Sequence, residues 1–344
     1  MSPIAEFITA SEASRRLGVS AKALRLYEER NLITPIRTEA GWRTYGPDEM
    51  SRAAQIVTLR DLGLSLGQVA RVFDGDAQEL DRVLATHLIN LRKQTSQLAD
   101  AMEQVRTMRT DLATGRAASA AELVELIDTR DKLHAGFDLP WPWGGERFEL
   151  HDIQPLTFIT GPLGSGKTRL AKRIAETLPG AAYLGLDRLA AGTQSLTSQL
   201  DASPDHQSRV KQAMIWLLDE GASDPVGLHA LVVELEVDTT AVLVVDMPEQ
   251  GLDGATQNAI AAYLRCRTGN VRRLFVLTRS SAILDLALVG RDETIIYCPA
   301  NHSPPMLVED IEGTPGYESV ATCLAPPNIR ARTEGVIAMR RRIG

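Results

Sequence analysis

Residues 161–168 read Gly-Pro-Leu-Gly-Ser-Gly-Lys-Thr, which matches the GxxxxGK[ST] pattern of a phosphate-binding loop. The preceding residues 156–160 are apolar and β-branched, as in a buried parallel strand. Residues 169–176 have the periodicity and composition of a helix. Because the motif requires a strand, a loop and a helix in this order, the sequence predicts an α/β P-loop domain over residues 148–344.

The loop itself predicts how a nucleoside triphosphate would be held. Glycines let backbone N–H groups approach phosphate oxygens, and the N-terminus of the following helix favours an anion. Lys167 is expected to reach the β and γ phosphates, and the Thr168 hydroxyl to bind Mg²⁺. The predicted cofactors are ATP and Mg²⁺, and the predicted contacts are Gly161, Gly164, Ser165, Gly166, Lys167, Thr168 and Arg169.

A second apolar run, residues 241–246, ends in Asp246. An acid at the C-terminal end of a central strand can hold the Mg²⁺ shell, so Asp246 joins Thr168 as a predicted metal contact. A third apolar run, residues 274–278, leads into Arg279. Arginine binds a γ-phosphate bidentately, so Arg279 is a further predicted nucleotide contact.

Residues 247–253, Met-Pro-Glu-Gln-Gly-Leu-Asp, resemble the DEPxxxLD stretch of ABC-type ATPases, in which a glutamate follows the strand aspartate. The resemblance covers residues 148–298 and is specific at the phosphate loop and Asp246. Met247 stands where the family has its general base, and a thioether cannot accept a proton from water. Glu249 is therefore the predicted catalytic residue, and turnover is expected to be weak or absent. Asp253 matches the aspartate of the family's D-loop.

The N-terminal part reads as two short helices, residues 8–17 and 21–30, around a tight turn at Gly18. This spacing is typical of a helix-turn-helix, whose second helix enters the major groove. A wing is expected next: residues 37–45 predict a β-hairpin with its tip near Gly41. Residues 59–70 predict a further helix pair.

Three motifs in this part resemble the MerR family of transcription regulators: Arg25-Leu-Tyr-Glu28, Gly41-Trp-Arg-Thr-Tyr45 and Leu62-Gly-Leu-Ser-Leu66. The resemblance covers residues 7–116. It implies that a promoter is distorted so that RNA polymerase, an expected partner, can engage. It also implies DNA contacts, and the residues predicted to make them are Lys22, Arg25, Tyr27, Arg37, Arg43 and Tyr45.

Residues 77–114 predict one long helix with leucine or valine every seven residues, the pattern of a two-stranded coiled coil. The predicted homodimer would present two reading helices to a near-palindromic double-stranded operator. The predicted organisation is a winged helix-turn-helix domain at 1–75, a dimerisation helix at 76–116, a linker at 117–147 and the P-loop domain. In the linker region, Trp143 or Phe148 either stacks on adenine or packs into the core.

Charge is unevenly distributed along the 344 residues, whose net charge is −7. Residues 1–116 hold 16 Lys and Arg against 15 Asp and Glu, so the acidic excess belongs to the remainder. No apolar run of about 18 residues predicts a membrane span, and no signal peptide is expected. The three cysteines have no metal spacing, and a cytoplasmic setting is expected.

Three functions fit these features. The first is a MerR-type regulator whose P-loop domain binds ATP as a switch. The second is a DNA-anchored ATPase in DNA repair, plasmid maintenance, mobile-element transfer or phage defence. The third is a nucleotide kinase fused to a DNA-binding domain. ATP turnover with and without DNA separates the first two, because only the second requires DNA-stimulated hydrolysis.

Overall fold

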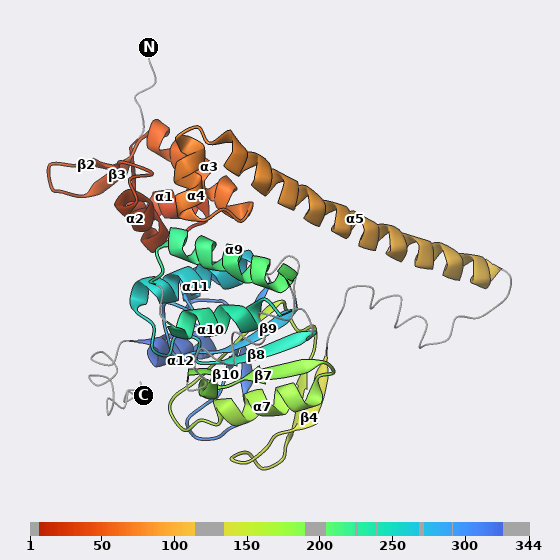
Figure 1. The fold of residues 1–344 in the computed structure, drawn as a ribbon. Helices are drawn as coiled ribbons and strands as arrows, with labels where there is room; N and C mark the ends of the chain where they lie inside the picture. Colours follow the sequence, from red (N-terminus) through yellow and green to blue (C-terminus); the bar gives the residue numbers. More distant parts are fainter. Residues whose placement is uncertain are drawn as a thin grey trace, which may run out of the picture. The chain divides into compact units, whose positions relative to one another are not determined.

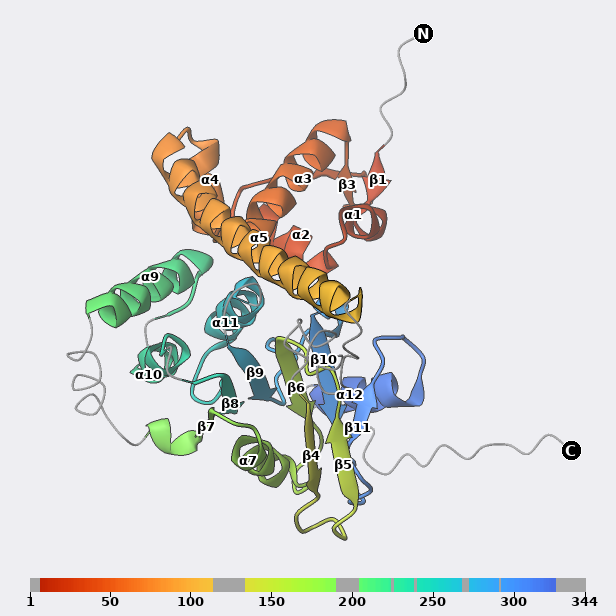
Figure 2. The same cartoon turned by 90° about the vertical axis from the view of Figure 1, so that its right-hand side faces the viewer.

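The computed structural model describes residues 7–113, 134–189, 204–223, 226–237, 240–267, 272–290 and 292–325. The chain divides into two compact units (Figures 1 and 2). The first contains residues 1–134 and 215–222, and the second contains residues 135–214 and 223–344. Residues 117–133 of the expected linker and residues 326–344 of the P-loop domain lie outside the described residues.

The first unit begins with a winged helix-turn-helix. Its order is β1 (Ile8–Thr9), α1 (Ala10–Leu17), α2 (Ala21–Glu29), β2 (Ile36–Arg37), β3 (Arg43–Tyr45), α3 (Pro47–Asp61) and α4 (Leu66–Phe73). The three strands form an antiparallel sheet in the order β1-β3-β2. Local signals set the helix ends: the Ser20 hydroxyl accepts from the Ala23 amide, and Gly18 ends α1 at φ 67°. The predicted helix-turn-helix and wing are confirmed.

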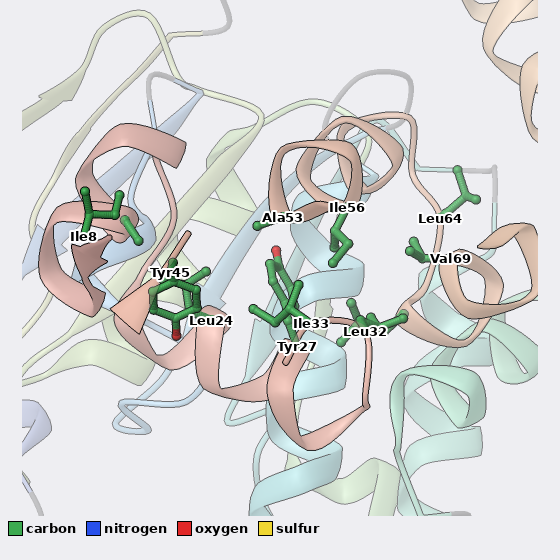
Figure 3. Close-up of a cluster of buried hydrophobic side chains, with 12 residues drawn as sticks. Ile8, Leu24, Tyr27, Leu32, Ile33, Tyr45, Ala53, Ile56, Leu64 and Val69 are labelled. Carbon is green, nitrogen blue, oxygen red and sulfur yellow. The ribbon is translucent and has the colours of Figure 1, made fainter. Parts of the chain in front are cut away.

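One apolar core holds these short elements together (Figure 3). Leu24 of α2, Ile56 of α3 and Val69 of α4 are at most 1% exposed, and they meet the aromatic ring of Tyr45 in the same cluster. A domain this small buries only a modest apolar area when it folds, so each of these buried side chains contributes strongly to its stability.

The long helix α5 (Ala77–Ala113) follows, with 37 residues. Five apolar side chains at the predicted seam are 41–56% exposed in the single chain: Leu84, Leu88, Leu91, Met102 and Val105. The helix is therefore confirmed, while its pairing with a second copy stays a prediction. None of the described helices is long and apolar enough to cross a bilayer.

The second unit is built on a six-stranded sheet in the order β11-β10-β6-β9-β8-β7. Five strands are parallel, and only β11 is antiparallel. The strands are β6 (Leu156–Thr160), β7 (Ala181–Leu184), β8 (Val242–Asp246), β9 (Arg273–Leu277), β10 (Glu293–Tyr297) and β11 (Met306–Val308). Every residue of β6 and β8 is buried, so both faces of the central sheet are covered.

The helices of the second unit join these strands. They are α7 (Lys167–Thr177), α10 (Val226–Leu235), α11 (Gly254–Cys266) and α12 (Pro315–Leu324), with short 3₁₀ turns at Leu186–Leu189 and Leu286–Leu288. Helix α9 (Pro204–Glu220) crosses the division between the units at residues 214 and 215. The expected linker is partly structured, because β4 (Ala135–Asp138) pairs antiparallel with β5 (Arg147–Leu150).

Candidate functional site

The sheet order brings three predicted segments to one edge. Strand β9 lies between β6 and β8 and runs parallel to both. The phosphate loop follows β6, Arg279 follows β9 by two residues, and Asp246 ends β8. Because the carboxyl ends of parallel strands share an edge, the loop, the arginine and the aspartate meet there.

The loop is shaped by glycines at positions where a larger residue would collide. Gly161 has φ 153°, and a Cβ there would strike the carbonyl oxygen of Cys298. Gly166 has φ 92°, and its Cβ would lie 2.6 Å from the ring of Trp143. Both positions therefore require glycine, which allows the tight turn that is typical of a phosphate-binding loop.

Lys167 points back into its own loop. Its Nζ donates to the carbonyl oxygens of Gly161 at 2.7 Å and Pro162 at 2.6 Å. Burial lowers the pKa of Lys167 below its ordinary value. The loop's own carbonyl oxygens thus hold the ammonium group. Phosphate oxygens are acceptors of the same kind and could take their place.

Asp246 gathers two hydroxyl groups at one carboxylate oxygen. Oδ2 accepts from Thr168 Oγ1 at 3.2 Å and from the Tyr183 hydroxyl at 2.7 Å. Thr168 and Asp246 are therefore placed together, as a shared Mg²⁺ shell requires. Tyr183 was not predicted, because it reaches the site from β7 and no local motif marks it. Burial, and then its bond to Asp246, raises the pKa of the Tyr183 hydroxyl.

The backbone after Asp246 is held by a buried arginine. The Arg188 guanidinium donates to the carbonyl oxygens of Asp246 at 2.7 Å and Met247 at 2.6 Å. Met247 has φ 48°, an uncommon backbone conformation for a side chain of this kind. Arg188 is thus a positioning residue that the sequence did not reveal, and it fixes where the methionine lies.

Glu249 and Arg279 meet directly. One Glu249 carboxylate oxygen, Oε1, accepts from the backbone N–H of Arg279 at 2.9 Å, and the other is buried. Burial raises the pKa of Glu249 above its ordinary value, although the bond from the Arg279 amide opposes this shift. The two predicted residues are therefore neighbours at the sheet edge.

The aromatic residues near the loop divide by exposure. Trp143 and Phe148, the two candidates for an adenine platform, are 5% and 9% exposed, so their core reading is confirmed. Trp143 donates its indole N–H to Ser303 O at 3.0 Å. Trp141 is 68% exposed, and the Arg169 guanidinium lies 4.3 Å from its ring centroid. Trp141 is the aromatic residue with an accessible face in this stretch.

On the first unit, four predicted DNA contacts lie at the surface. Lys22 and Arg25 are exposed on α2, and Arg37 is exposed on β2. Arg43 of β3 is half-buried. Glu28 forms ion pairs with both wing arginines, at 2.8 Å to Arg37 and with Arg43. The hydrogen bond from Arg43 lowers the pKa of Glu28. The two ion pairs hold both wing arginines at this one carboxylate.

Comparison with known proteins identifies this unit. Residues 8–76 match the family model described as MerR HTH family regulatory protein. A Haemophilus influenzae protein named "Probable heavy metal-dependent transcriptional regulator" is 31% identical over 103 residues, covering 28% of this chain and 80% of that protein. The chain belongs to the MerR family. A heavy metal-dependent transcription regulator of Rhizobium meliloti is also 31% identical, over 28% of this chain and 69% of its own length.

Solved structures resemble the two parts of this MerR-family chain separately. HiNmlR, a MerR family regulator bound to promoter DNA, covers 36% of the chain at 20% identity and a TM-score of 0.26. The ADP conformation of MJ1267, an ATP-binding cassette of an ABC transporter, covers 59% of it at 12% identity and a TM-score of 0.37. In the described ranges, no group of three or more His, Cys, Asp or Glu side chains is placed to hold a metal.

Two predicted DNA contacts in the MerR domain are core residues. Tyr27 is 5% exposed and Tyr45 is 0% exposed, and both belong to the hydrophobic cluster of Figure 3. The Tyr45 hydroxyl is buried and makes no hydrogen bond to the described residues. Side chains in these positions cannot touch a DNA backbone as they stand. The motif therefore marks packing at Tyr27 and Tyr45, whereas DNA contacts by its arginines stay a prediction.

Tyr45→Phe tests this correction. Removing a buried hydroxyl that has no partner should leave the free energy of unfolding unchanged or raise it, because such a group costs about 1–3 kcal/mol. DNA affinity should stay within about 2-fold of wild type, since no phosphate contact is lost. Denaturant unfolding and fluorescence anisotropy measure the two quantities. Weaker DNA binding with unchanged stability would show that the hydroxyl contacts DNA after all.

Proposed function

We propose that this MerR-family protein is a DNA-binding transcription regulator whose P-loop domain binds ATP with Mg²⁺ as its signal and hydrolyses it slowly or not at all. The observation that carries the proposal is the assembled site at the sheet edge: Lys167 in its loop, and Thr168 on Asp246. A winged helix-turn-helix in the same chain gives such a signal a target.

The residues present fit a magnesium nucleotide. Lys167 and the loop amides would face the phosphates, Thr168 and Asp246 would hold Mg²⁺, and Arg279 lies beside them at the end of β9. When bound, Mg²⁺ neutralises phosphate charge. Trp141, exposed and close to the loop's Arg169, would offer its ring to the base.

Slow turnover follows from the residue after Asp246. Met247 has no group that accepts a proton, and Arg188 holds its backbone in place. Glu249 would have to serve as the base, but one of its carboxylate oxygens is already engaged by the Arg279 amide. A bound triphosphate would therefore persist. This suits a regulator that responds to nucleotide binding better than an enzyme that uses the energy of hydrolysis.

The DNA-binding half would act as a homodimer. Five exposed apolar side chains follow the heptad seam of α5, and burying them against a second copy removes apolar surface from water. Lys22, Arg25, Arg37 and Arg43 would meet DNA on each protomer, so the operator would be near-palindromic. Distortion of this operator, with RNA polymerase as the responding partner, would be the output.

A second candidate is a DNA-anchored ATPase, as in repair, plasmid maintenance, mobile-element transfer or phage defence. The buried carboxylate of Glu249 beside Arg279 favours it, because such a group can act as a general base. This function requires turnover that rises on adding DNA, whereas the regulator requires only binding.

Lys167→Ala tests the nucleotide switch. The variant should lose most Mg-ATP affinity while keeping its fold, because the ammonium contacts to phosphate are removed. In wild type, Mg-ATP should change operator affinity or distortion, and DNA should change ATP affinity by the same factor, roughly 5-fold or more. Calorimetry and DNA-binding titrations measure both. Lys211→Ala on α9 removes the same charge from an exposed position and is the matched control. Unchanged ATP affinity in Lys167→Ala would defeat the assignment.

Arg43→Ala tests the wing. Losing a phosphate contact should weaken binding across DNA sequences and reduce the slope of log affinity against log salt by about 0.9. Arg106→Ala, which removes an exposed arginine from α5, should leave the slope unchanged. Equal slopes for wild type and Arg43→Ala would exclude this arginine from the DNA surface.

Glu249→Gln and Met247→Glu test hydrolysis. Met247→Glu restores a base and should raise a slow wild-type rate, within the ~10²–10⁴-fold that general bases contribute. If Glu249 supplies residual turnover, that turnover should fall as pH drops through its raised pKa, because the protonated carboxyl cannot accept a proton. Phosphate release across pH measures this. A fast wild-type rate that vanishes in Glu249→Gln would favour the ATPase function.

A further inference from the structure

Residues 215–222, which we call the docking segment, complete the MerR domain although they come from the middle of the chain. They belong to the first unit together with residues 1–134. Trp216 donates its indole N–H to the carbonyl oxygen of Gly63 at 2.9 Å. Asp219 forms an ion pair with Arg71 at 2.7 Å. The family model matches residues 8–76, so the docking segment lies outside the matched region.

Glu220 is the centre of the docking segment. Its side chain is only 4% exposed, and one carboxylate oxygen accepts from Arg60 Nη1 at 2.8 Å and from the Leu66 N–H at 2.9 Å. Leu66 begins α4, so the carboxylate satisfies a backbone donor in the first turn, where a negative charge is favoured. A buried carboxylate without such partners would be strongly destabilising. Arg60 and the Leu66 N–H therefore compensate for the burial of Glu220.

The docking segment reaches the joint between α4 and α5. Arg71 of α4, which pairs with Asp219, also lies 3.9 Å from Glu79 at the start of α5. Gln68 of α4 donates to the same Glu79 carboxylate at 2.6 Å. The residues that hold α5 against the reading domain therefore share one polar network with the docking segment.

The chain leads from Glu220 to the nucleotide domain within three residues. Gly221 has φ 104°, and a Cβ there would collide with the Arg30 guanidinium. The Arg30 guanidinium also donates to the Glu220 carbonyl oxygen at 2.8 Å. Ser223, the first residue of the second unit after this segment, donates its hydroxyl to Asp253 at 2.7 Å, and its N–H donates to Thr256 Oγ1 at 2.9 Å.

Asp253 lies at the end of the turn that follows Asp246. Backbone bonds close this turn, from Gln250 N to Met247 O at 3.0 Å and from Leu252 N to Glu249 O at 3.1 Å. Asp253 also caps α11 through the Thr256 N–H at 2.8 Å. The hydrogen bonds from Thr256 and Ser223 lower the pKa of Asp253. Asp253 therefore connects the turn after Asp246 to Ser223 through hydrogen bonds.

We propose that the docking segment carries the nucleotide state of the P-loop domain to the joint between α4 and α5. This proposal rests on the proposed function and specifies its route. Phosphate and Mg²⁺ would act on Asp246 and its turn, the turn on Ser223, and the docking segment on Arg60, Arg71 and the first turn of α4. Only interactions that differ between the two nucleotide states contribute to such coupling.

Hydrogen exchange on the full-length protein tests the route. Mg-ATP should change amide exchange over residues 63–73 in wild type, and not in Lys167→Ala. Asp219→Ala breaks the half-exposed ion pair, and Glu220→Gln keeps the shape of the buried side chain while removing its charge. Both variants should keep ATP affinity, and the effect of ATP on operator affinity, roughly 5-fold or more in wild type, should fall to about 2-fold or less. Asp205→Ala removes an exposed charge from the other end of α9 and should keep the full effect.

The outcomes separate the two proposals. If ATP binds and shifts DNA binding, yet exchange at 63–73 is unchanged or both variants keep the full effect, the route is wrong and the switch stands. If exchange at 63–73 responds to ATP but DNA affinity and distortion do not, the route stands and the regulatory function fails. If wild type does not bind Mg-ATP, both proposals fall. Should Glu220→Gln fail to fold, which its melting curve would show, Asp219→Ala decides alone.

Discussion

The proposed nucleotide site depends on the burial of a parallel sheet on both faces. Strands β6 and β8 have no exposed residue, so their polar backbone groups are satisfied within the sheet and only their ends can meet a ligand. Strand β9 lies between them, so it sets the distance from the phosphate loop to Asp246. Arg279, which follows β9, therefore comes between the end of β6 and the end of β8. The polar residues beyond the strands, Tyr183 and Arg188 among them, then adjust a geometry that the apolar core has already fixed.

In the MerR domain, the ion pairs among charged side chains matter as well as the total charge. Glu28 holds Arg37 and Arg43 on the wing, so the protein itself orients both cations. An ion pair at the surface contributes little to stability, about 0–1 kcal/mol. The effect of these pairs is to fix where the two guanidinium groups lie. Residues 1–116 are almost neutral in total, so a DNA surface must come from placement on one face.

Sequence revealed the features that are encoded within a few neighbouring residues. The phosphate loop, the caps of α1 and α2 and the heptads of α5 are local patterns, and the structure has helices α1, α2 and α5 where these patterns predict them. Features that depend on distant packing were missed or misread. Tyr27 and Tyr45 follow a surface motif yet fill the core, and Trp141 rather than Trp143 is exposed, since burial is decided by what the rest of the chain covers. Tyr183, Arg188 and Glu220 act 63, 58 and 154 residues away from the groups they bind, so no spacing rule reveals them.

Helix α5 is long enough that a small tilt at one end would move the other end by several ångströms. Its 37 residues extend for about 55 Å at 1.5 Å per residue. Because its first turn is gripped by α4 through Glu79, a tilt of roughly 5° at that end would displace the far end by about 5 Å. The helix would thus act as a lever whose base is its first turn, at the contact of Glu79 with α4. In the proposed regulator, a sub-ångström adjustment at the base of α5 would be amplified along its length, so a change in the bound DNA would not require a large rearrangement in the P-loop domain.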